Sequence, residues 1–202
     1  MSLSFLWILL AMGFYGGIHS VLASGSAKLL AARWFGSSGF RFYRLLFNFI
    51  VFLTLLPVFW LVQVLPNKIL YTIQPPWIFL TGVLQVLAVL GLLAGVLQSG
   101  ALSFLGFTQI FQPENSAAPA HLVVNGLYHW VRHPLYTCGL LFIWLSPTMS
   151  LNLLAFNLSA SLYIIIGIQF EERKLLAEFG ESYSNYRKLT PMLIPGLSSN
   201  RR

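Results

Sequence analysis

Four stretches of this chain are each long enough and apolar enough to cross the hydrocarbon core of a membrane, which takes about 20 helical residues. They are Leu3–Ala23, Leu45–Leu65, Trp77–Gln98 and Leu151–Phe170. Hydrophobic residues make up 57% of the chain and the mean hydropathy is +0.75, which is more apolar surface than a soluble domain can bury. The sequence therefore predicts an all-α integral membrane protein.

A fifth apolar stretch, Pro134–Met149, is shorter and spans only about 24 Å at 1.5 Å per helical residue. The basic residues indicate whether it crosses. If it does, 11 of the 12 Lys and Arg residues share one side and Lys68 lies on the other; if it does not, the split is 5 to 7. Because basic residues concentrate in cytoplasmic loops, we expect five transmembrane helices, with the N-terminus outside and the C-terminus in the cytoplasm.

The spans divide the chain into segments of what we expect to be a single membrane domain over residues 1–202. These segments are three N-terminal spans (1–98), a cytoplasmic segment (99–133), a helical hairpin (134–170) and a cytoplasmic tail (171–202). The first span has no basic residues ahead of it and runs past signal-peptide length, so we expect a retained helix. The cytoplasmic segment contains "QPENSAAPA", which fits either a lid over a site or a plain connector.

Two periodic patterns predict how helices pack. In the tail, apolar residues recur at steps of four, four and three, which is typical of an amphipathic helix on a membrane surface: Leu175, Phe179, Tyr183 and Tyr186. Small residues four apart in the first and third spans, among them Gly13, Gly17, Gly91 and Gly95, predict close contact with other helices.

Composition argues against several functions. The single Cys138 excludes a disulfide framework, and a chain with no Asp and only five Glu residues is a poor source of metal ligands. We therefore expect no metal site. The net charge of +7 is explained by basic loops beside an anionic inner leaflet, so we expect the lipid bilayer as a partner and no nucleic acid.

Two polar clusters flank the predicted hairpin. "WVRHPLYTCG" carries Arg132 and His133 just before it, and "QFEERKL" carries Glu171 and Glu172 just after it. Both ends of a hairpin reach the same membrane face, so these clusters can converge there. Ionisable groups at a membrane edge point to function. The alternatives remain an arginine that reaches lipid phosphate beside interfacial aromatic residues, and a salt-bridged helix exit.

The order of these motifs resembles the catalytic half of the isoprenylcysteine carboxyl methyltransferase superfamily, which includes phospholipid N-methyltransferases. The shared pattern is a Gly-x-Tyr, an Arg-His-Pro-x-Tyr, a Glu-Glu pair and a late Phe-Gly-x-x-Tyr-x-x-Tyr, over about residues 120–196. "WLSPTMSLNLLAF" and "QFEERKL" look most like the bacterial branch of methanethiol S-methyltransferases and NnrU-like proteins.

The resemblance implies S-adenosylmethionine as cofactor. The residues that it assigns to cofactor binding are His121, Leu122, Val123, Gly126, Tyr128, Arg132, His133, Tyr136, Glu171 and Glu172, with Gln109 as a weaker candidate. Arg132, His133, Tyr136 and Glu171 are also the expected catalytic residues. The chemistry agrees: a guanidinium suits the cofactor's carboxylate, a glutamate suits its hydroxyl and amino groups, and tyrosine rings attract its sulfonium.

We therefore expect a membrane-embedded methyltransferase that acts on a small thiol or lipophilic acceptor. His133 or Tyr136 is expected to accept the proton that a thiol must lose. The alternatives are a protein-S-isoprenylcysteine carboxyl O-methyltransferase-like enzyme, a membrane reductase of related architecture, and a non-catalytic accessory protein of the same fold. A multi-pass protein of the bacterial inner membrane is expected by analogy; the acceptor and the oligomeric state stay open.

Overall fold

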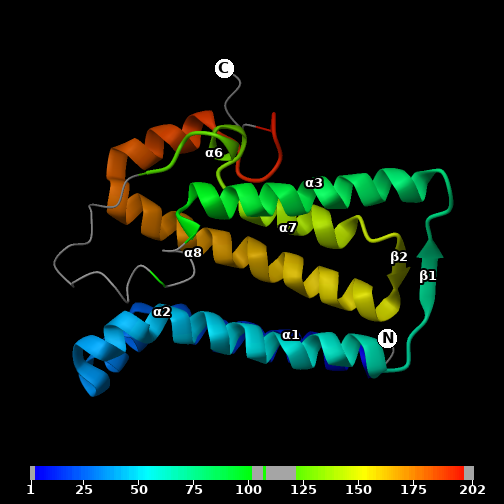
Figure 1. The fold of residues 1–202 in the computed structure, drawn as a ribbon, viewed down its shortest axis with the longest axis horizontal. Coiled ribbons are helices and arrows are strands. Elements are labelled where there is room, and N and C mark those ends of the chain that lie inside the picture. Colours follow the sequence, from blue (N-terminus) through cyan, green and yellow to red (C-terminus); the bar gives the residue numbers. More distant parts are fainter. Residues whose placement is uncertain (1–2, 102–106, 108–121, 198–202) are drawn as a thin grey trace. The chain divides into compact units, whose positions relative to one another are not determined.

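The computed structural model describes residues 3–101, 107 and 122–197, apart from the side chains of residues 37–41. The stretch "QPENSAAPA" and the candidates Gln109 and His121 lie outside these residues. The helices and strands are α1 (Leu3–Ala23), α2 (Gly25–Val64), β1 (Ile69–Thr72), α3 (Trp77–Gln98), α6 (Leu127–Trp130), α7 (Pro134–Trp144), β2 (Thr148–Ser150) and α8 (Leu151–Leu189) (Figure 1). The chain is thus mostly helical, as predicted, with one two-stranded sheet that the sequence analysis did not anticipate.

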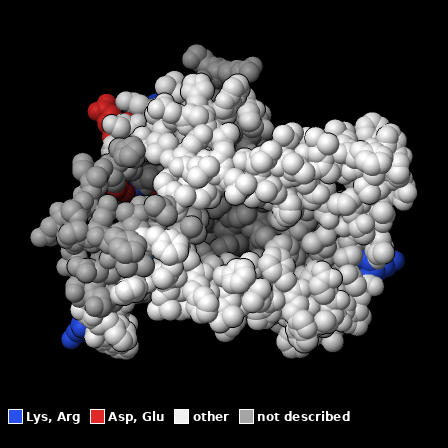
Figure 2. Space-filling view, in the orientation of Figure 1, with Lys and Arg blue, Asp and Glu red and all other residues white. Residues whose placement is uncertain are grey.

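Four helical segments are long and apolar enough to cross a membrane, so the four long apolar stretches form helices, as predicted. They are Leu3–Ala23, Phe42–Val64, Trp77–Gln98 and the apolar part of α8. The fifth predicted span forms only the 11-residue helix α7, about 16 Å long, before the chain enters β2. The face shown in Figure 2 is almost entirely uncharged, as expected for helices that meet lipid.

Residue contacts divide the chain into two compact units. The described residues of the first are 3–70, 100–101, 107 and 150–159, and those of the second are 71–99, 122–149 and 160–197. The first therefore holds α1, α2 and the start of α8. The second holds α3, α6, α7 and the rest of α8, together with both polar clusters.

In the first unit, α1 packs along α2 (Figure 1). The side chain of Asn152 fixes the start of α8 to the end of α2. The Asn152 side chain is fully buried, and its Nδ2 donates hydrogen bonds to the carbonyls of Val62 (3.3 Å) and Leu65 (3.1 Å). Its backbone N–H donates to Oδ1 of Asn67 at 3.1 Å. Asn152 thus satisfies carbonyls at the end of α2 that the helix itself leaves unpaired.

In the second unit, α3 and α7 lie side by side (Figure 1). Two glycines of α3 lie at the contact between these helices. A Cβ atom at Gly91 would lie 2.6 Å from Sγ of Cys138, and one at Gly95 would lie 2.8 Å from Cδ2 of Leu135. The predicted close packing of the third span is therefore confirmed. The prediction is not supported for Gly13 and Gly17, because no described atom lies within 4 Å of a Cβ built at either position.

The predicted tail helix is the continuation of α8. The helix runs from Leu151 to Leu189, and its backbone leaves helical geometry at Gly180, where φ is 53°. The expected apolar face exists, since Tyr183 is only 1% exposed and Leu175, Phe179 and Tyr186 are half-buried. Tyr186 donates a hydrogen bond to the carbonyl of Tyr128, so part of this face covers the segment that carries the first polar cluster.

Candidate active site

Local backbone rules position the first cluster. Pro134 is the first residue of α7, where its missing N–H leaves no hydrogen bond unmade. Proline disfavours helical angles at the preceding residue, and His133 accordingly has φ −124° and ψ 64°. Arg132 and His133 therefore lie in a short non-helical turn between α6 and α7, with their backbone N–H groups free of helix bonds.

Gly126 is the first residue of this segment, and its backbone conformation requires glycine even without a bound ligand. Its φ is 63° and its ψ is −126°, a combination that residues with a side chain rarely adopt. A Cβ atom there would also overlap the side-chain amide of Gln98, whose Oε1 accepts a hydrogen bond from the backbone N–H of Leu127 at 3.1 Å. Gln98 thus joins the end of α3 to the start of α6.

Replacing Gly126 with alanine is expected to lower the free energy of unfolding by about 1–3 kcal/mol, because the backbone is strained and Gln98 is displaced. Equilibrium unfolding in detergent micelles measures this. Gly167→Ala is the matched control, since a Cβ atom in the middle of α8 meets no described atom within 4 Å. Equal stability of the two variants would contradict the role assigned to Gly126.

The two clusters meet through a buried ion pair. Nη2 of Arg132 lies 2.6 Å from Oε1 of Glu172, and Nε donates to the same oxygen at 2.7 Å. Each side chain is only 10% exposed. Because Coulomb attraction strengthens as water is excluded, this pair links α8 firmly to the turn before α7. The predicted convergence of the two clusters is confirmed.

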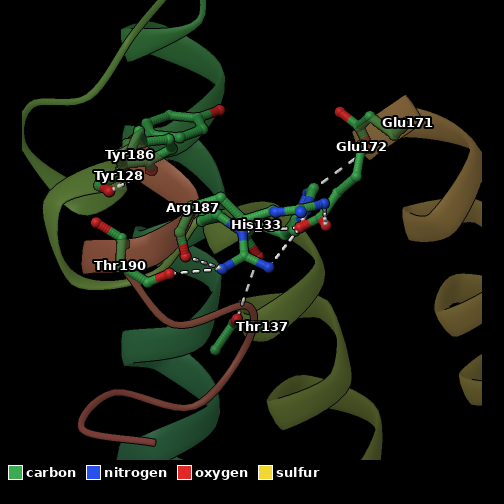
Figure 3. A network of polar contacts seen from close by, with 9 residues as sticks. Tyr128, His133, Thr137, Glu171, Glu172, Tyr186, Arg187 and Thr190 are labelled. Carbon is green, nitrogen blue, oxygen red and sulfur yellow. Dashed lines mark hydrogen bonds and ion pairs between the residues drawn. The ribbon is translucent and has the colours of Figure 1, made fainter. Parts of the chain in front are cut away.

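His133 lies between the two glutamates (Figure 3). Its Nε2 is 3.2 Å from Oε1 of Glu172, its Nδ1 is 3.8 Å from Oε2 of Glu171, and its side chain is 3% exposed. The ring stacks on Tyr136 at 5.7 Å between centroids. A proton on Nε2 is the assignment that gives Glu172 a donor, and it leaves Nδ1 facing Glu171.

The adjacent glutamates have different surroundings. Glu172 is buried and engaged by Arg132 and His133, whereas the Glu171 side chain is 44% exposed. One Glu171 oxygen, Oε2, is nevertheless buried and accepts no hydrogen bond from the described residues. A buried carboxylate oxygen without a donor is costly, so Glu171 is the place in this cluster where a ligand hydroxyl or amino group fits best.

Two tyrosines add hydroxyl groups near Glu171. Burial raises the pKa of Tyr128, and the nearby charge of Glu171 raises it further, against a hydrogen bond with Ser99 that lowers it. The Tyr128 phenol therefore stays protonated at neutral pH and can donate a hydrogen bond. Tyr136 lies beside Glu171 as well, and its ring covers one face of His133.

The structure thus gathers most of the predicted site residues in the second unit. Tyr128, Arg132, His133, Tyr136, Glu171 and Glu172 form the cluster, and Gly126 shapes the segment that leads to it. Leu122 and Val123 lie half-buried in the irregular stretch before Gly126, with no contact to the cluster among the described interactions. Among the described residues, no group of His, Cys and Glu side chains is arranged to hold a metal ion.

Sequence reasoning missed three residues that support the cluster: Gln98, Thr137 and Thr190. The Thr190 carbonyl accepts from Arg132, and the Thr137 hydroxyl donates to the Leu193 carbonyl (both threonines are labelled in Figure 3). Gln98 ends α3 and accepts from the backbone N–H of Leu127. A polar residue at the last position of an apolar span was the available signal for Gln98. The "TPMLIP" segment ends α8, and no sequence pattern showed that it folds back on the turn.

Relatives of the chain carry methyltransferase names. Methanethiol S-methyltransferase 2 of Bradyrhizobium diazoefficiens is 49% identical over 76 residues, which are 38% of this chain and 29% of the relative. Methanethiol S-methyltransferase 1 of the same organism is 28% identical over 192 residues, 93% of this chain and 65% of the relative. Protein-S-isoprenylcysteine O-methyltransferase of Xenopus laevis is 32% identical over 129 residues, 60% of this chain and 42% of the relative.

These matches confirm the resemblance to the isoprenylcysteine carboxyl methyltransferase superfamily and to its methanethiol-methylating bacterial branch. In each of the three pairs the match spans less than two thirds of the relative's own length. No protein-family model matches the chain. No solved structure matches it significantly.

Proposed function

We propose that this chain, a relative of methyltransferases, is a membrane-embedded S-adenosylmethionine-dependent methyltransferase that acts on a small thiol or another lipophilic acceptor. The observation that carries the proposal is the cluster formed where α7 begins and where the apolar part of α8 ends. There His133 and two tyrosines lie beside the Glu171 carboxylate, whose buried Oε2 accepts no hydrogen bond from the part of the chain that the structure describes.

The residues present fit the cofactor. Oε2 of Glu171 suits a ribose hydroxyl or the ammonium group of the methionine part, each of which donates hydrogen bonds. The rings of Tyr128 and Tyr136 suit its positively charged sulfur, because a cation is attracted to an aromatic face. Leu122, Val123 and Gly126, and His121 outside the described residues, complete the proposed binding segment.

S-Adenosylmethionine supplies an activated methyl group when bound. The protein's part is to align the acceptor, to exclude water and to accept a proton where the acceptor is a thiol. His133 and Glu171 are placed for proton acceptance, since Nδ1 of His133 faces Oε2 of Glu171 at 3.8 Å. Glu172 holds His133 in this orientation from the other side of the ring.

We propose five membrane crossings, with the N-terminus outside and the tail in the cytoplasm, as one membrane domain of a bacterial inner membrane. The 11-to-1 distribution of basic residues supports the fifth crossing, although α7 alone is short. This orientation places the cluster in the compartment where S-adenosylmethionine is made. The bacterial relatives support the assignment to a bacterium.

Binding of S-adenosylhomocysteine to the purified full-length protein in detergent micelles tests the proposal directly. Isothermal titration is expected to show saturable binding at micromolar concentration. If no binding is seen at high micromolar ligand, the methyltransferase assignment is wrong. The remaining alternatives are then a membrane reductase and a non-catalytic accessory protein.

A second candidate acceptor follows from the match to an isoprenylcysteine O-methyltransferase, which extends over 129 residues. We therefore pair labelled S-adenosylmethionine with methanethiol, with a prenylated cysteine analogue and with phospholipid vesicles. Label transferred to methanethiol is the expected result. Transfer to the carboxyl group of the prenylated cysteine would assign the second function instead.

A further inference from the structure

The segment that follows α8 folds back along the turn before α7. The carbonyls of Thr190, Pro191 and Met192 accept hydrogen bonds from that turn, and the carbonyl of Leu193 accepts one from Thr137 in the first turn of α7. We name the segment Thr190–Leu193 the C-terminal strap. The Thr190 carbonyl accepts from Nη1 of Arg132 at 2.6 Å. The carbonyls of Pro191 and Met192 accept from the backbone N–H groups of Arg132 (2.9 Å) and His133 (3.2 Å), and that of Leu193 accepts from Oγ1 of Thr137 at 2.8 Å.

The strap satisfies two backbone N–H donors that neither α6 nor α7 uses. The N–H groups of Arg132 and His133 precede α7, so without the strap they would lack a protein partner. Pro191 keeps the strap itself out of helical geometry beyond Thr190. The position of the His133 backbone, and hence of its ring between the glutamates, depends on these bonds.

The Arg132 side chain has little capacity left for a ligand. A guanidinium carries five N–H donors in a fixed plane. Nε and Nη2 point at Oε1 of Glu172, while Nη1 donates to the carbonyls of Thr190 (2.6 Å) and Arg187 (3.1 Å). A bidentate contact to a cofactor carboxylate would require some of these bonds to break.

We propose that Arg132 is a positioning residue rather than a ligand of the cofactor carboxylate, and that the C-terminal strap is a required part of the site. Arg132 holds Glu172 with one edge of its guanidinium and the strap with the other. Together they fix His133 and, through it, the binding geometry at Glu171. This inference rests on the proposed function and deepens it.

The first test compares two ligands: S-adenosylhomocysteine and its decarboxylated analogue, which lacks the carboxylate. Titrations use the full chain in micelles, for wild type, Arg132→Gln and the exposed control Arg173→Gln. We expect Arg132→Gln to weaken both ligands by the same factor, about tenfold or more, because the whole site is displaced. Weakening confined to S-adenosylhomocysteine would show that Arg132 binds the carboxylate and would overturn the inference.

The second test loosens the strap without touching Arg132 or the glutamates. Thr137→Val removes only the hydroxyl that donates to the Leu193 carbonyl and, at 3.1 Å, to that of His133. The matched control is Thr81→Val in α3, where the hydroxyl donates to the Ile78 carbonyl of its own helix at 3.0 Å. Hydrogen–deuterium exchange reports on the amides of Arg132 and His133, which donate to the strap.

We expect faster exchange at these two amides in Thr137→Val than in Thr81→Val, and S-adenosylhomocysteine affinity lower by about threefold or more. Unchanged exchange and affinity in Thr137→Val would overturn the role of the strap. The wild-type titration separates this inference from the proposed function. If the wild-type protein binds neither ligand, the proposed function is wrong. If the wild-type protein binds and the variants bind equally well, only the role of the strap is wrong.

Discussion

Replacing Glu172 with glutamine is expected to lower the free energy of unfolding by about 3–5 kcal/mol. Glutamine keeps the shape of the side chain but removes its charge, so the guanidinium of Arg132 stays buried without a counter-ion. Both side chains are only 10% exposed, and water therefore compensates little for the loss. His133 loses the charged acceptor of its Nε2 in the same variant.

Equilibrium unfolding in mixed micelles measures this loss, with Glu178→Gln as the matched control on the exposed side of the same helix. The control is expected to change stability by no more than about 0.5 kcal/mol. A double-mutant cycle with Arg132→Gln isolates the pair: because the two groups contact each other, the combined loss should be smaller than the sum of the single losses. Additive losses would mean that the ion pair contributes nothing of its own.

The neighbouring substitution, Glu171→Gln, is expected to weaken S-adenosylhomocysteine binding by about 10- to 100-fold and leave the fold intact. A hydrogen bond to a charged acceptor contributes about 1.5–3 kcal/mol, and each 1.4 kcal/mol is tenfold in affinity. Glutamine removes the charge and can turn a donor toward the ligand. Its melting temperature should stay within about 2 °C of wild type, since the Glu171 side chain is 44% exposed.

Titration and thermal unfolding on the same preparation separate affinity from stability. Glu178→Gln again serves as the control, with wild-type affinity expected. If Glu171→Gln binds as tightly as wild type, the buried Oε2 of Glu171 is not where the ligand donates. If it loses binding and stability together, Glu171 supports the fold instead of the ligand.

The different effects expected for Glu171 and Glu172 show what the sequence alone could not predict. Successive residues on a helix point about 100° apart, so one glutamate of the pair must face a different environment from the other. The motif could not tell which of them meets Arg132, because that depends on where the turn before α7 lies across the helix. The structure assigns Glu172 to the ion pair and leaves Glu171 with a buried oxygen that has no hydrogen-bond donor within residues 3–101, 107 and 122–197.

The partners of Arg132 were also beyond what the sequence could predict. Its charge and its place beside His133 suggested a ligand for a carboxylate, and the sequence held no sign of what would occupy it. Two of its partners are backbone carbonyls, of Arg187 and Thr190, more than fifty residues away. A carbonyl is present at every residue, so no pattern of side chains could have pointed to these two.

The sequence by itself determined the four long apolar helices typical of a membrane protein, the apolar face of the tail helix and the convergence of two polar clusters. Each follows from hydrophobic length, from helical period or from the rule that both ends of a hairpin reach one side. The tertiary structure alone decided which glutamate is buried, that Gln98 and the C-terminal strap hold the turn, and that Arg132 is already engaged. The physical reason is that these outcomes rest on close packing and on long-range bonds to backbone, which composition and spacing do not encode.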